Sequence, residues 1–157
     1  MSLDSPSAAP VHGADFKIGI VAARFNPALV DALLARVRAD LAAAGVAGKN
    51  ITVLRVPGSH EVPWAAQRLA ASGKRDGVIA LGVLIGGDTN HHELVGQSVS
   101  YALQRIALDT GVPVINGVIV ADNLAQARAR TTGKINRGAE FAAAALAMAA
   151  LKREGAR

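Results

Sequence analysis

Short apolar runs rich in β-branched residues alternate along the chain with stretches of helical spacing. The runs cover residues 16–23, 51–56, 77–85 and 113–120. Such near-continuous apolar runs predict strands that are covered on both faces. Because helices are expected between them, the strands predict βαβ units. We therefore expect an α/β fold, a three-layer α/β/α sandwich of the flavodoxin-like type around a four-stranded parallel sheet.

The first helix is predicted by apolar residues that repeat at i, i+3, i+4, i+7 and i+11. These residues are Val30, Leu33, Leu34, Val37 and Leu41. Gly45 is the expected stop of this helix, and Gly111 that of a later one. Further helices are expected over residues 63–72, from 94 to about 111, over 123–130 and over 139–153.

The last of these helices is rich in alanine and apolar most of the way round. A helix with so little polar face is buried or packs on a neighbour. The pattern favours an oligomer, although the high helix propensity of alanine would by itself explain the same composition.

A chain of 157 residues suits one domain with its own core. Residues 1–15 are predicted to form a flexible N-terminal arm, and residues 16–157 a single domain. No apolar run reaches the roughly 18 residues that span a membrane, and no secretory signal pattern is present. The absence of cysteine excludes disulfides and thiolate zinc sites. These features together predict a cytoplasmic protein.

The net charge of +5 raises the question of a nucleic-acid partner. The chain has only three Phe, one Tyr and one Trp, too few to predict a base-stacking platform. The basic residues are spread along the chain, apart from a denser group between Arg128 and Arg137. We interpret that group as a site for an anionic small molecule, such as a phosphate ester, rather than for nucleic acid.

Residues with candidate chemistry follow the predicted strands. In an open parallel α/β sheet, ligands bind beyond the carboxyl ends of the strands. Phe25 follows the first run and suits stacking on a planar ring, or it closes the edge of the core. Ser59 and Glu61 stand at a helix start after the second run, where they suit a polyhydroxylated ligand. Simple N-capping by Ser59 explains this position equally well.

The third run ends in the segment "GGDTNHHE", residues 86–93. Its glycines permit a tight turn, and the helix N–H groups with the Thr89 hydroxyl suit an anion. His91 and His92 diverge by about 100° on a helix, which argues against a shared metal ion. One of them suits proton transfer, because imidazole exchanges protons near neutral pH. A solvated polar helix start explains the segment as well as catalysis does.

In order and spacing, six segments of the chain resemble the lumazine synthase family of riboflavin biosynthesis. The resemblance covers residues 17–151. The segments are "ARFN" (23–26), "VPGSHEVP" (56–63), "DGVIALGVLIGGDTNHHELV" (76–95), "GVPVINGVIV" (111–120), "QARAR" (126–130) and "KINRGAE" (134–140). Each segment alone is weak, but the six together are highly specific.

The resemblance implies an enzyme, a transferase that needs no cofactor and no metal. In this reaction 5-amino-6-(D-ribitylamino)uracil condenses with 3,4-dihydroxy-2-butanone 4-phosphate, which gives 6,7-dimethyl-8-ribityllumazine, phosphate and water. The implied partners are small-molecule substrates and further copies of the chain, with active sites between subunits, and neither nucleic acid nor membrane. Two alternatives stay open: an oligomer that binds flavin or lumazine with weak or no turnover, and a mainly structural shell.

The resemblance also implies roles for individual residues. His91 would transfer protons. The residues that would hold the pyrimidinedione and the ribityl chain are Phe25, Ser59, Glu61, Val83, Leu84, Ile85 and Asn116. The residues that would hold the phosphate are Asp88, Thr89, Arg130 and Lys134, and Arg130 would reach the site of the adjacent subunit.

The chain departs from the family pattern in the site and in one turn. Gly86 stands where Arg or Lys is usual, which removes a positive charge. Asn116 replaces a common Phe, as in some bacterial members, and His92 replaces a usual aromatic. The turn between Arg130 and Gly138 looks one residue shorter than in members that form 60-subunit shells. This favours a free pentamer over a decamer or a shell.

Overall fold

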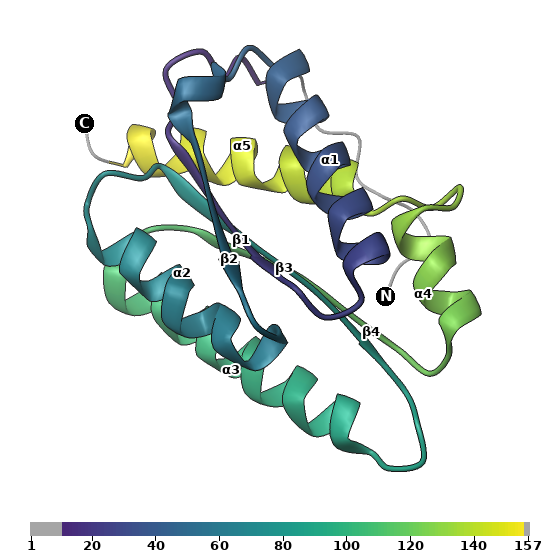
Figure 1. The fold of residues 1–157 in the computed structure, drawn as a ribbon. Helices are drawn as coiled ribbons and strands as arrows, with labels where there is room; N and C mark the ends of the chain where they lie inside the picture. The colour runs from purple at the N-terminus through teal and green to yellow at the C-terminus, as the bar shows by residue number, and fades with distance from the viewer. Residues whose placement is uncertain (1–10, 156–157) are drawn as a thin grey trace.

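Four parallel strands form the central sheet of the computed structural model, which describes residues 11–155 (Figure 1). The strands are β1 (Ile18–Ala23), β2 (Ile51–Val56), β3 (Gly77–Ile85) and β4 (Val114–Ala121). Their order across the sheet is β2-β1-β3-β4, and every pairing is parallel. The predicted four-stranded parallel sheet is confirmed, and each strand begins and ends within two residues of its predicted run.

Helices cover both faces of this sheet, as the prediction of three layers requires (Figure 1). One face carries α1 (Pro27–Ala43), α4 (Leu124–Thr131) and α5 (Gly138–Glu154). The other face carries α2 (Val62–Ala71) and α3 (His91–Thr110). Two 3-10 turns, η1 (Gly48–Asn50) and η2 (Ser59–Glu61), flank β2. Over residues 11–155, none of these helices has the length and apolar character to cross a membrane.

Alternate residues of the strands enter two separate apolar cores, one on each face. In β1, Ile18 and Ile20 belong to the core beneath α1 and α5, whereas Val21 and Ala23 belong to the core beneath α2 and α3. This is the alternation of a strand that is buried on both faces. All the residues of β1 are buried. Because β1 is held by packing on both faces, the position at which the loop after it begins is well defined.

Left-handed glycines end two of the helices where the sequence predicts stops. Gly45 has φ +93° just beyond α1, and Gly111 has φ +66° just beyond α3. The Gly111 N–H donates to the carbonyl of Ala107 at 3.0 Å. Glycine adopts this conformation without the clash that a Cβ would cause.

Residues 11–15 of the expected N-terminal arm contact the rest of the chain. Val11 packs against the core beneath α1 and α5. The Gly13 N–H donates to the carbonyl of Ala44 at 2.8 Å. Residues 1–10 of the arm lie outside the described residues, so a boundary at residue 15 stays a prediction.

Arg153, near the end of α5, ties this helix to the start of β3. Its guanidinium donates to both carboxylate oxygens of Asp76, at 2.9 and 2.8 Å. The backbone N–H of Lys17 also donates to Asp76, at 2.7 Å. Burial raises the pKa of Asp76, but these hydrogen bonds and the charges of Arg153 and Lys152 outweigh it. The net result is a pKa below the ordinary value.

We expect Asp76→Asn to lower the free energy of unfolding by about 1 kcal/mol at pH 7, because hydrogen bonds to a charged group are lost. Since the pKa of Asp76 is lower in the folded chain, its contribution is complete above the unfolded pKa of about 3.9 and disappears as the pH falls through the folded value. Urea unfolding of both forms, at one protein concentration, measures the difference. The difference in the free energy of unfolding between the two forms should narrow as the pH falls from about 5 toward 2. A difference that does not change with pH would contradict this account.

Candidate active site

A cavity of about 470 Å³ opens beyond the carboxyl ends of β1, β2 and β3. Its walls come from the loop after β1, the η2 turn, the last residues of β3 and the start of α3. This is the edge at which parallel α/β sheets bind ligands. Of the twelve site residues predicted from the sequence, the eight that line the cavity are Phe25, Ser59, Glu61, Val83, Leu84, Ile85, Thr89 and His91.

Phe25 stands at the mouth of this cavity with 71% of its surface exposed. It therefore does not close the edge of the core, which was one of the two sequence-based interpretations. The next residue, Asn26, has the left-handed φ of 55° and donates from its side chain to the carbonyl of Val83 at 2.9 Å. This bond ties the loop after β1 to β3. The backbone beside Phe25 is thus fixed, and its exposed ring is available for stacking on a planar ligand.

Ser59 is 4% exposed, and its hydroxyl has no hydrogen-bond partner within the described chain. It does not cap a helix, so the alternative interpretation of this residue as an N-cap is wrong. A Cβ on Gly82 would lie 2.4 Å from the Ser59 hydroxyl, so only glycine leaves room for it. A buried hydroxyl without a partner is costly. Since Ser59 lines the cavity, a polar ligand group would satisfy it.

The end of β3 offers backbone groups to the same cavity. β3 pairs with β1 only as far as Leu81, whereas it pairs with β4 as far as Ile85. Beyond Leu81, the peptide groups of β3 on the β1 side have no strand to bond. The carbonyl of Val83 is taken by Asn26. The remaining groups suit the donor and acceptor pattern of a planar heterocycle.

His91 is the first residue of α3, and it is exposed on the cavity wall beside Thr89. No side chain caps α3. Asp88 is exposed and does not belong to the cavity wall. Glu93 already donates its N–H to the carbonyl of Asn90 at 3.1 Å, whereas the N–H groups of His91 and His92 remain for an anion. Among residues 11–155, no group of three or more His, Asp or Glu side chains is placed to hold a metal ion.

The structure gives a steric reason for Gly86. A Cβ on this residue would lie 2.4 Å from the carbonyl oxygen of Asp122 and 3.2 Å from Nε2 of His92. Asp122 is itself fixed, because its N–H and its carboxylate both bond the side chain of Gln126. The close approach of His92 occupies space on one side of Gly86. The glycine and the unusual histidine therefore belong to one packing arrangement.

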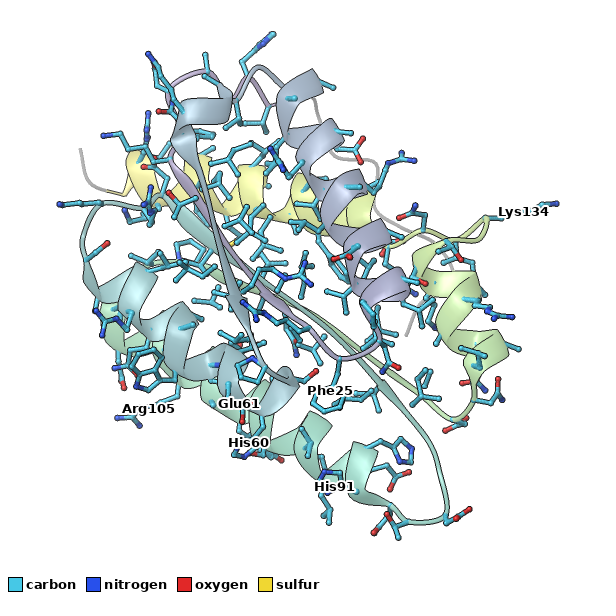
Figure 2. All side chains as sticks on the ribbon, viewed as in Figure 1. Phe25, His60, Glu61, His91, Arg105 and Lys134 are labelled. Atoms are coloured by element: carbon cyan, nitrogen blue, oxygen red, sulfur yellow. The ribbon has the colours of Figure 1, made fainter. Side chains whose placement is uncertain are left out.

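Besides Asp88, three predicted residues lie outside the cavity of their own chain. Asn116 pairs with Ala80 in the sheet, and its amide donates to the Ser100 hydroxyl at 3.4 Å. Arg130, on α4, donates to the carbonyl of Gln126 at 3.1 Å. Figure 2 shows Lys134 on the turn between α4 and α5, pointing away from Phe25, Glu61 and His91. A role for these residues in the site would require a second subunit.

One histidine of the cavity wall was not considered in the sequence-based prediction of the site. His60 lies in η2 between Ser59 and Glu61 and lines the same cavity as His91. The only signal in the sequence was the imidazole itself, inside the segment "VPGSHEVP".

Comparison with known proteins identifies one family that matches nearly the whole chain. The family described as 6,7-dimethyl-8-ribityllumazine synthase matches residues 15–153. The 6,7-dimethyl-8-ribityllumazine synthase of Polaromonas sp. (strain JS666 / ATCC BAA-500) is 45% identical over 141 residues, which is 90% of each chain. The Paracidovorax citrulli enzyme of the same name is 44% identical over 151 residues, 96% of each chain. With this coverage and identity, the chain belongs to the 6,7-dimethyl-8-ribityllumazine synthase family.

Proposed function

We propose that this chain condenses 5-amino-6-(D-ribitylamino)uracil with 3,4-dihydroxy-2-butanone 4-phosphate to form 6,7-dimethyl-8-ribityllumazine. The reaction releases phosphate and water and is the penultimate step of riboflavin synthesis. The observation that carries this conclusion is the family match over residues 15–153, together with a cavity at the edge of the sheet that the family motifs line. The chain is a transferase.

The proposed binding mode follows from the cavity walls. Phe25 stacks on the pyrimidinedione, whose polar edge meets the backbone of Val83, Leu84 and Ile85. Ser59 and Glu61 bind the hydroxyls of the ribityl chain, which supply the partner that the buried Ser59 hydroxyl lacks. Thr89 and the first turn of α3 bind the phosphate, and Asp88 contributes its backbone N–H beside them.

Catalysis in this proposal is mostly positioning. When both substrates are already bound in contact, the reaction no longer has to bring two free molecules together. The entropy saved in this way is a large part of the activation barrier. The remaining requirement is proton movement during imine formation, elimination of phosphate and ring closure. His91 is exposed on the cavity wall next to the phosphate side and is assigned this role.

Arg130, Lys134 and Asn116 complete the site from an adjacent subunit of a homopentamer in this proposal. Their positions outside the cavity of their own chain support it. Exposed apolar residues also support an oligomer; among them are Trp64, Tyr101, Leu108 and Leu151. The short turn before α5 favours the pentamer over a shell. Sedimentation separates the two, because a 60-subunit shell has twelve times the mass of a pentamer.

The cytoplasmic location stays a prediction.

Incubation of the purified protein with both substrates tests the function. Product formation is followed by the absorbance of the lumazine. We expect steady turnover that requires both substrates. Absence of product, combined with tight binding of riboflavin, would instead support the flavin- or lumazine-binding oligomer.

We expect Arg130→Ala to raise the KM for the phosphate substrate by about tenfold and to change the KM for the pyrimidinedione little, because one charge-assisted contact is lost. Arg128→Ala is the matched control, since Arg128 is an exposed residue of the same helix and carries the same charge. Steady-state kinetics with each substrate varied in turn measures the effect. An unchanged KM for the phosphate substrate would remove Arg130 from the site.

Co-expression of Arg130→Ala chains with His91→Ala chains tests whether the site lies between subunits. In a mixed oligomer, some sites then combine an intact His91 from one chain with an intact Arg130 from its neighbour. We expect the mixture to be more active than either variant alone at low concentrations of the phosphate substrate. No gain in activity would place both residues in a site within one chain.

A further inference from the structure

We propose that His60 is a second proton-transfer residue of the cavity, in addition to His91. The proposal rests on the condensation proposed above and adds a residue to its machinery. Two imidazoles from different elements, η2 and α3, line the same open cavity.

His60 and His91 line two neighbouring hollows of the surface. His60, Glu61 and His91 line the main cavity, and the same three residues line a groove that continues from it along α3. The floor of this groove is formed by Leu94, Val95 and Ser98. Figure 2 shows His60 and Glu61 at the end of η2, close to the start of α3 that carries His91. A ligand in the main cavity therefore lies within reach of both rings.

Glu61 gives His60 a defined neighbour. Nδ1 of His60 lies 3.9 Å from one carboxylate oxygen of Glu61. The other carboxylate oxygen accepts the backbone N–H of Gly58 at 2.9 Å, which holds the carboxylate in place. The carboxylate lies on the Nδ1 side of the ring, which leaves Nε2 on the far side from it. The His60 side chain is 68% exposed, so it exchanges protons with water.

The chemistry needs such a group at imine formation. The amine nitrogen bonds to the carbonyl carbon, and one proton passes from nitrogen to oxygen to give a carbinolamine. Protonated His60 then gives its proton to the carbinolamine hydroxyl, which leaves as water while the nitrogen lone pair forms the C=N bond. The resulting iminium N–H returns its proton to the now neutral His60. The step needs no other reactant, and His60 ends as it began.

With a second imidazole in the cavity, His91 does not have to act as both the acid and the base of the reaction. Elimination of phosphate requires removal of a proton from carbon, whereas loss of water from the carbinolamine requires delivery of a proton to oxygen. One residue would have to change protonation state between these steps. Two residues on different elements perform them in sequence without that delay.

The test compares His60→Gln and His60→Phe with the wild-type protein. Glutamine keeps a hydrogen-bonding side chain but cannot act as an acid or base near neutral pH, and phenylalanine keeps a ring of similar size. We expect both variants to lower kcat about fivefold, with the KM for each substrate changed less than about twofold. Added imidazole should restore part of the activity of both variants. A purely structural role for His60 would produce no such rescue.

His12→Gln is the matched control, because His12 is exposed and lies in the N-terminal segment away from the cavity wall. We expect it to retain wild-type kinetics and to gain nothing from imidazole. Wild-type kcat in both His60 variants would overturn the proposal while leaving the condensation intact. A wild-type protein without turnover would overturn the proposed function itself, so the two failures are distinguishable.

Discussion

Replacing His91 with alanine should lower kcat by about 10- to 100-fold and leave the KM for both substrates close to the wild-type value. A positioned proton carrier contributes at least this much to a proton-transfer step. The loss is bounded, because the variant still holds the two substrates together and the condensation proceeds slowly without a carrier. Steady-state kinetics by lumazine absorbance measures the change.

His92→Phe is the comparison that makes this result specific. The two histidines are adjacent, and both line the cavity. The His92 ring, however, packs toward Gly86, and its Nδ1 is buried without a hydrogen-bond partner in the described chain. Phenylalanine keeps that packing, so we expect turnover within about twofold of wild type. An equal loss of kcat in the His91 and His92 variants would contradict the assignment of proton transfer to His91 alone.

The sequence predicted the sheet and helices closely because their signals are local and mutually consistent. β1 and β3 read as unbroken apolar runs, since both of their faces are buried. Of the two interpretations of Phe25, the exposed ring just beyond β1 is the correct one. In each case, a short segment contains the information that determines the structure.

Other features depend on neighbours that a single segment does not reveal. The roles of Ser59 and Gly82 become visible only when β3 and η2 are side by side, with a hydroxyl 2.4 Å from the place of a missing Cβ. His60 becomes a candidate only through the fold, which brings it to the same cavity as His91. Arg130 and Lys134 remain predictions, since their proposed partners belong to another copy of the chain.

Gly86→Arg, which restores the residue usual in the family, should harm this protein. The Cβ that arginine brings would lie 2.4 Å from the Asp122 carbonyl oxygen, and a backbone atom cannot swing aside as a side chain can. The ends of β3 and β4 would have to separate, although the Gly86 N–H donates to the carbonyl of Ala121 at 2.8 Å. We expect a loss of about 3 kcal/mol in the free energy of unfolding, measured by urea unfolding at one protein concentration.

Gly87→Ala is the matched control for this strain. Gly87 is the next residue of the same turn, and a Cβ there would meet nothing within 4 Å. We expect it to change the free energy of unfolding by less than about 0.5 kcal/mol. Gly86→Ala should lose nearly as much as Gly86→Arg, because both place a Cβ against Asp122. If only the arginine variant were destabilised, the cause would be its charge or length, and the steric account of Gly86 would be wrong.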